Sequence, residues 1–338
     1  MTVEKTEERL SALEEFRRDF PEVWKRIPFK GVFVSLLVLW VLLFEFLGNS
    51  TFGYIDTHSL FAWTSYSYIS SHDDEHGFFI PFIVLALLWW KRNEFRSISA
   101  RPWLPALGLI AFALALHVIG YLAQQARVSL AAFYFGLYAL CGVVWGPAVL
   151  KATFFPMCLF AFALPLGTLA ETITFPMRLF ATWFTGNIAQ VALGIDVVHQ
   201  GTLIFDPSGT YQYEVAAACG GLRSLTAVLA LCTIFGFMNF SKWRNRLIMF
   251  AAAFPLAIIG NMTRLLGLIV VSEAFGAETG HMVHDNTWFS LLPYVPPIVG
   301  IVLVGHFLRE QTPGEKVETP APEESGRFGP QAELTAKS

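Results

Sequence analysis

Long apolar runs are the feature that most constrains the fold of this chain. Eight runs of mainly aliphatic and aromatic residues lie between residues 31 and 308. A membrane-crossing helix needs about 20 mostly apolar residues, because every backbone polar group must be paired within the hydrocarbon. The runs predict an all-α fold, a polytopic membrane helix bundle of about eight transmembrane helices, over residues 31–47, 77–90, 103–122, 130–149, 152–166, 216–238, 247–271 and 288–308.

The positive charges predict how these spans are oriented. If all eight runs cross the membrane, most Lys and Arg residues of the short loops fall on one side. These residues lie before the first span and between spans two and three, four and five, and six and seven. Cytoplasmic loops are enriched in Lys and Arg, so both termini are expected in the cytoplasm.

Composition agrees with a membrane protein that has two polar ends. The chain is 54% hydrophobic and 14% charged, and residues 1–30 and 309–338 hold 11 of its 23 basic and 13 of its 26 acidic residues. A net charge of -3 offers nucleic acid no basic surface, and a soluble monomer is excluded. We expect a cytoplasmic polar segment over 1–30, a membrane domain over 31–308, and a disordered cytoplasmic tail over 309–338.

Residues 168–193 form a further helix in this interpretation, although Pro176 is expected to break its middle. A full crossing here would invert every later loop, so we interpret it as an interfacial or re-entrant helix on the outer face, with Trp183 in the headgroup layer. Residues 198–216 alternate polar and apolar side chains around a turn at 206–209, which predicts a short outer hairpin.

Cys219 stands apart from the other cysteines because Ala and Gly flank it. If a helix starts at the glycines, its dipole lowers the thiol pKa; if the helix continues through them, Arg223 lies one turn away and favours the thiolate. The alternative is that the small residues serve close helix packing and that Cys219 is inert. Cysteine in an apolar run behaves as a small hydrophobe, as expected for Cys141, Cys158 and Cys232.

Asn261 and Arg264 lie three positions apart on one face of an apolar helix. Arg264 is about 25 Å from Leu247 at ~1.5 Å per residue, which places it in the outer half of the span. There it can stabilise the oxyanion formed when a thiolate attacks an amide. The alternative is a structural Arg that reaches lipid phosphate.

His284 follows on the same outer side as a candidate general acid or base, with His281 as a competitor and Asp285 as a possible orienting group. The alternative for either histidine is a solvated loop residue. His72 and His76 have a metal-ligand spacing, but Gly77 and the polar loop argue against a rigid helix there. We expect neither a metal site nor a cofactor.

The three blocks at 218–224, 261–264 and His284 resemble the motifs of the exosortase/archaeosortase family of multi-pass cysteine transpeptidases. The resemblance implies cleavage of a C-terminal sorting signal of exported proteins, of the PEP-CTERM type in bacterial members. It implies an acyl-enzyme on Cys219, transition-state support from Arg264 and proton transfer by His284. It places the enzyme in the bacterial inner membrane, with its active site on the outer, periplasmic face.

Within these motifs, the substrate-binding residues are expected to be Arg223, Ser224 and Asn261. Two features depart from the family pattern: Gly220 stands where the family usually has Ser or Thr, and Asn286 and Thr287 replace a glycine expected shortly after the histidine. The histidine at the third position makes the chain more similar to a bacterial exosortase than to an archaeosortase. The expected partners are exported proteins with a C-terminal transmembrane sorting signal and membrane lipid. The competing hypothesis is a transporter or polysaccharide-export component that uses Arg223 and Arg264 as an anion site.

Overall fold

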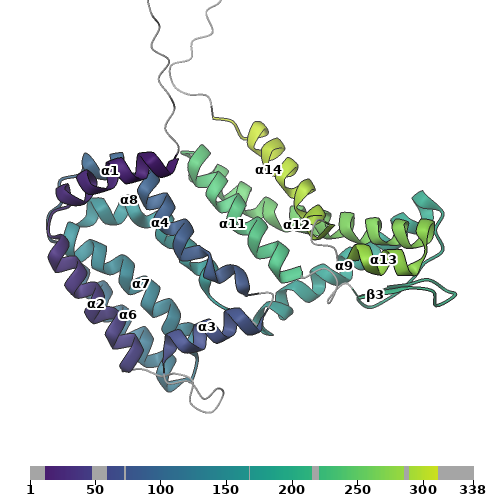
Figure 1. The fold of residues 1–338 in the computed structure, drawn as a ribbon, viewed down its shortest axis with the longest axis horizontal. Helices are drawn as coiled ribbons and strands as arrows, with labels where there is room; N and C mark the ends of the chain where they lie inside the picture. The colour runs from purple at the N-terminus through teal and green to yellow at the C-terminus, as the bar shows by residue number, and fades with distance from the viewer. Residues whose placement is uncertain are drawn as a thin grey trace, which may run out of the picture.

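The computed structural model describes residues 12–47, 59–71, 74–166, 168–214, 221–284 and 289–310. Within this part the chain is mostly helical, with one small antiparallel sheet toward its C-terminal half (Figure 1). The side of the molecule that carries this sheet is called the sheet side below. The predicted helix bundle is therefore observed, with a short β element added to it.

The N-terminal half is a helical layer. Its elements are α1 (Ala12–Arg26), α2 (Lys30–Phe46), α3 (Leu60–Ser70), η1 (Glu75–Phe78), α4 (Ile80–Trp90), α5 (Arg92–Arg96), α6 (Ala106–Leu122), α7 (Ala126–Trp145), α8 (Pro147–Cys158) and η2 (Leu159–Ala163). Helices α1 and α2 meet at a bend of 97°. Figure 1 shows α1 lying across the ends of the helices that follow it.

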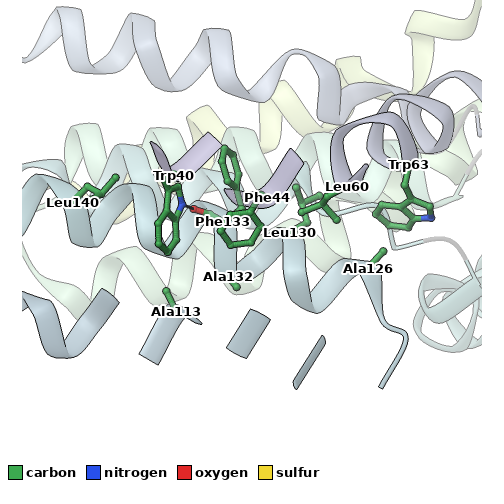
Figure 2. Close-up of a cluster of buried hydrophobic side chains, with 10 residues drawn as sticks. All are labelled: Trp40, Phe44, Leu60, Trp63, Ala113, Ala126, Leu130, Ala132, Phe133 and Leu140. Carbon is green, nitrogen blue, oxygen red and sulfur yellow. Dashed lines mark hydrogen bonds between the residues drawn. The ribbon is translucent and has the colours of Figure 1, made fainter. Parts of the chain in front are cut away.

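Aromatic packing holds α2, α3 and α7 together, as Figure 2 shows. Phe44 is fully buried between the rings of Trp40 and Phe133, and the Trp40 indole Nε1 donates to the backbone oxygen of Phe133 at 3.1 Å. The hydrogen bond satisfies the one polar atom of this indole. A second cluster, built on Val84 and Leu159, joins α4 to α8 and η2.

The C-terminal half carries the sheet. Its elements are α9 (Thr168–Leu193), β1 (Val198–Gln200), β2 (Leu203–Phe205), β3 (Gln212–Glu214), α11 (Gly221–Asn239), α12 (Trp243–Phe275), α13 (Ala277–His284), η3 (Phe289–Tyr294) and α14 (Val295–Phe307). The strands pair antiparallel in the order β1-β2-β3. Tyr211 and Tyr213 pack with Leu265 and Leu268 of α12, which fixes the sheet against the end of that helix.

Each of the eight expected spans overlaps a helix, but few of these helices are long enough to cross a bilayer by themselves. Among the described residues, α7 and α12 qualify by length and composition, and the bent pair α1–α2 makes a third if it is one span. Helix α12 has 33 residues and is about 50 Å long at 1.5 Å per residue, well beyond the hydrocarbon thickness. The shorter apolar helices are at Glu75–Trp90, Ala106–Leu122, Pro147–Ala163, Ser224–Asn239 and Leu291–Phe307. The eight-span arrangement stays a prediction.

Helix α9 has the limits that the sequence predicts, but Pro176 does not break it. The expected break was wrong. Proline removes only one backbone N–H from the helix, and the packing of the other residues of α9 outweighs that loss. Thr174 and Ala181 are buried on either side of Pro176, and Thr185 is fully buried further along. Small side chains at this spacing let neighbouring backbones approach closely, which holds the helix continuous.

The predicted hairpin is confirmed as β2 and β3. The backbone N–H of Gly209 donates to the oxygen of Asp206 at 2.8 Å, which closes the turn at the expected place. A second turn at Gly201, with φ of 61°, adds β1 as a third strand.

Candidate functional site

Ser224 of α11 and Asn261 of α12 meet in the protein interior. The Ser224 Oγ donates to the Asn261 Oδ1 at 3.4 Å, a long hydrogen bond, and only 6% and 7% of the two residues is exposed. These residues come from two of the three sequence blocks. The structure therefore brings the first block and the second block side by side, as the predicted site requires.

Arg264 lies one turn beyond Asn261 on α12. It is half-buried, and its Nε is buried without a hydrogen-bond partner. Within the described part of the chain it forms no ion pair either. Counted from Trp243 at the start of α12, Arg264 lies about 32 Å along the helix axis, toward the sheet side. This distance is close to the thickness of the hydrocarbon core of a bilayer, about 30 Å. The guanidinium is thus an available hydrogen-bond donor near one end of the possible span.

Helix α13 brings the histidines to the same end of α12. Its docking depends on Gly280, because a Cβ there would lie 2.1 Å from the Ser272 Oγ and 2.3 Å from the Tyr213 Oη. Those two hydroxyls are themselves hydrogen-bonded at 2.5 Å. His281 is exposed, with its ring centroid 5.8 Å from that of Tyr213. His284 is the last residue of α13, and its side chain is not among those described.

The remaining candidates of the first block are only partly covered. Cys219 and Gly220 lie outside the described residues, and Arg223 is described by its backbone in α11 alone. The other three cysteines are free thiols. Cys141 and Cys232 are buried and Cys158 is half-buried, which confirms that they sit among packed side chains.

A pocket that sequence reasoning missed opens between α9 and α12. Three of its lining residues come from each helix: Thr174, Met177, Arg178, Ala257, Ile258 and Asn261. Helix α9 packs against both α11 and α12 at this point, as Figure 1 shows. The signal in the sequence that could have indicated it is a charged residue, Arg178, in an otherwise apolar helix.

Polar contacts fix the loop that leads into α9. The backbone N–H of Leu166 donates to Asp74 Oδ1 at 3.0 Å, and the Nε of Arg127 donates to the oxygen of Pro165 at 2.7 Å. Asp74 is buried, so its carboxylate serves as an internal acceptor for this loop. These bonds hold the start of α9, and with it the pocket, against α7 and η1.

Two titratable groups on the sheet side have shifted pKa values. Burial, with the nearby Glu273 carboxylate, raises the pKa of Tyr211 to about 12. The hydroxyls of Ser208 and Thr210 lower the pKa of the Asp206 carboxyl in the β2–β3 turn. Among the described residues, no three His, Cys, Asp or Glu side chains are placed to hold a metal ion. His72 and Asp73, part of the sequence stretch considered for a metal, lie outside that set.

The comparison with protein families decides the assignment. The family model described as transmembrane exosortase matches residues 63–292, which include Cys219, Arg264 and His284. The chain belongs to the exosortase family. No curated protein and no solved structure matches it.

Exosortases are membrane cysteine transpeptidases, and family membership implies that this chain is a membrane enzyme that processes proteins with C-terminal sorting signals. The resemblance drawn from the three sequence blocks is thereby confirmed.

Proposed function

We propose that this exosortase cleaves the C-terminal sorting signal, of PEP-CTERM type, from exported proteins through an acyl-enzyme on Cys219. The observation that carries the proposal is the Arg264 guanidinium, which has an unpartnered Nε one turn from the Ser224–Asn261 pair. An unpartnered donor in a low-dielectric setting is suited to stabilise charge that develops only during the reaction.

The first half of the reaction forms the acyl-enzyme. His284 accepts the proton of the Cys219 thiol, and the thiolate attacks the scissile carbonyl carbon. The α11 helix begins at Gly221, two positions after Cys219 in the sequence, and the positive end of its dipole favours the thiolate. Arg264 donates to the oxyanion of the tetrahedral intermediate, and Arg223, Ser224 and Asn261 bind the peptide around it.

The second half releases both products. His284 returns the proton to the leaving amine, so the C–N bond breaks, the signal helix departs and a thioester remains on Cys219. A water molecule or an acceptor amine then attacks the thioester carbonyl and gives its proton to His284. The C–S bond breaks, the processed protein is released, and the proton returns to the thiol. His281, three positions earlier on α13, is the competing proton carrier.

The topology completes the proposal. With eight spans, both termini and the positively charged loops face the cytoplasm of a bacterial inner membrane, and the sheet side faces the periplasm. Residues 31–308 then form the catalytic membrane domain. The length of α12 supports a position of Arg264 near one membrane face, because the helix exceeds the hydrocarbon thickness and carries Arg264 beyond its middle.

Co-expression with a reporter protein that ends in a candidate sorting signal tests this function. We expect the native enzyme to shorten the reporter, Cys219→Ala to leave its intact mass unchanged, and the control Cys158→Ala to behave like the native enzyme. The product mass distinguishes hydrolysis from transfer. A Cys219→Ser variant that processes the reporter at the native rate would contradict thiol catalysis. A reporter that the native enzyme leaves uncut for several candidate signals would favour the anion-site alternative with Arg223 and Arg264.

A further inference from the structure

Strand β3 is an edge strand of the small sheet. The strand order is β1-β2-β3, so β3 pairs with β2 on one side only. Helix α9 contacts β1 and β2, and no described residue forms a backbone hydrogen bond to the other side of β3. This side is called the free edge below. An edge strand presents unpaired N–H and C=O groups, which form a template for pairing with another extended chain.

The hydrogen-bond pattern of β2 and β3 shows which backbone groups face the free edge. Residues that lie opposite each other in an antiparallel pair alternate between bonded and non-bonded pairs. The backbone N–H of Asp206 donates to the oxygen of Tyr211 at 3.1 Å, so the next bonded position on β3 is Tyr213. Gln212 and Glu214 occupy the non-bonded positions. Their backbone N–H and C=O groups therefore point away from β2, toward the free edge.

The helices that carry the candidate catalytic groups lie next to this strand. Tyr213 is buried in one cluster with Leu265 of α12, the residue that follows Arg264. The ring centroid of His281 on α13 lies 5.8 Å from that of Tyr213, and Figure 1 shows β3 beside α13. A peptide bound along β3 is therefore close both to the helix of Arg264 and to the helix of the two histidines.

The chain leads from β3 directly to the proposed nucleophile. Cys219 follows Glu214 by five residues. A fully extended chain advances about 3.3–3.6 Å per residue, so the Cα atoms of these two residues lie at most about 18 Å apart. A peptide that pairs with β3 covers the same distance in about five of its own residues. The paired segment thus lies within about five residues of the bond that Cys219 attacks.

We propose that the free edge of β3 binds the sorting signal near its scissile bond as an added β-strand, through the backbone groups of Gln212 and Glu214. This inference rests on the proposed function and adds to it the way in which the substrate is held. In an added strand, every second residue of the peptide turns its N–H and C=O groups toward the edge. Main-chain amides of the substrate, rather than its side chains, carry this part of the binding.

A proline at position 212 tests the free edge without breaking the sheet. Gln212→Pro removes the outward N–H, whereas the bonds from Tyr213 to β2 remain. We expect kcat/KM for a synthetic peptide with a candidate sorting signal to fall about tenfold in proteoliposomes, mainly through KM. Gln212→Ala keeps the N–H and should lose less. His199→Pro is the matched control, because His199 lies opposite Ile204 and has the corresponding outward position on β1, at the other edge.

Ester substitutions in the peptide test which substrate groups the edge binds. Replacing one amide outside the scissile bond by an ester removes a single N–H and leaves every side chain in place. With the native enzyme, we expect esters at alternate residues to lower kcat/KM about three- to tenfold and those between them to have little effect. Gln212→Pro should abolish this alternation. Equal effects at successive residues, or an alternation that Gln212→Pro retains, would overturn the proposal.

Amide hydrogen exchange identifies what occupies the edge. In the substrate-free enzyme the amides of Gln212 and Glu214 should exchange fast, and the peptide should slow them in Cys219→Ala. Amides that are protected without peptide would show that another segment of this chain or a second copy covers the edge, and the proposal would then be wrong. A change from dimer to monomer in Gln212→Pro would identify the second copy. Equal losses of activity and of melting temperature in Gln212→Pro and His199→Pro would assign the edge a structural role instead.

The failure of this inference is distinguishable from the failure of the proposed function. If Cys219→Ala still cleaves the peptide, the catalytic proposal fails, whatever the exchange at the free edge is. If Cys219→Ala is inactive, and neither Gln212→Pro nor the esters change cleavage by the otherwise native enzyme, the cysteine mechanism stands and only the added strand is refuted.

Discussion

Asn245 at the start of α12 donates its Nδ2 to Glu310 Oε1, beyond the end of α14, at 2.9 Å. The same carboxylate accepts the backbone N–H groups of Ser241 and Lys242 at 3.2 and 2.9 Å. Glu310 thus pairs donors at a helix N-terminus, where a negative charge is favourable. One side chain ties α14 to the end of α12 opposite the candidate site.

The Glu310 contact predicts an acid-sensitive contribution to stability. The hydrogen bonds that Glu310 accepts lower its pKa from the usual 4.5. The backbone N–H of Lys242 has the largest effect, followed by the backbone N–H of Ser241 and the side chain of Asn245. A carboxyl whose folded pKa is depressed stabilises the fold above its unfolded pKa and loses this effect as pH falls through the folded value. The melting temperature of Glu310→Ala in detergent should be lower than native at pH 7, and the gap should close below about pH 4.5. A gap of constant size, or the same gap for the exposed control Glu22→Ala, would contradict this.

Arg92 is predicted to hold α1 against the bundle. Its Nη2 contacts the carboxylates of Glu15 and Asp19, and its guanidinium lies 4.7 Å from the ring centroid of Trp89. Arg92→Ala should weaken this docking by about 1 kcal/mol, since the acidic partners are partly exposed. Hydrogen exchange of the α1 amides should accelerate while exchange in α7 stays unchanged. Unaltered α1 exchange would mean that Phe16 and its ring contact with Trp89 suffice.

Gly280→Ala should displace α13 and with it His284. The added Cβ meets the Ser272 Oγ and the Tyr213 Oη, so we expect reporter processing to fall at least about tenfold, as for a misplaced catalytic group. Combining it with Ser272→Ala and Tyr213→Phe removes both obstructing oxygens and should restore part of the rate. Gly108→Ala, where a Cβ meets nothing within 4 Å, is the control. Native activity in Gly280→Ala would show that α13 tolerates displacement.

Arg264 is expected to act in the transition state. Arg264→Gln should lower kcat for a cleavable reporter by about 100- to 1,000-fold with little change in KM, as for the loss of an oxyanion donor. Arg264→Lys keeps the positive charge but lacks the planar set of N–H donors of the guanidinium, so it should recover part of kcat. Single-turnover mass analysis measures acyl-enzyme formation directly. A change confined to KM would instead assign Arg264 to substrate binding.

Hydropathy predicts the helices of the bundle well because the bilayer imposes one requirement, paired backbone groups in apolar segments, on every span. The limits of α9 and the β2–β3 turn follow equally from local signals. Helix α1 was not predicted as a helix, since its many charges conceal a stripe of apolar residues with helical spacing. That stripe consists of Leu13, Phe16, Phe20 and Trp24.

The candidate site shows where such reasoning ends. Asn261 and Arg264 stand out locally as polar residues in an apolar helix, and the family motifs select them. Arg178 carries the same local signal, yet the pocket that it lines depends on which face of α12 packs against α9, and no local pattern specifies that pairing. The contact of Ser224 with Asn261 is likewise tertiary.

The uninterrupted course of α12 places a constraint on how this sequence can diverge. The Glu310 tie and the Ser224 contact engage the same helix, at Asn245 and Asn261. Inserting or deleting one residue between them would rotate one contact relative to the other by about 100°. The number of residues between Asn245 and Asn261 is therefore more constrained than their identity. A fixed length of α12 keeps the Glu310 contact and the candidate site on the helix faces where their partners lie.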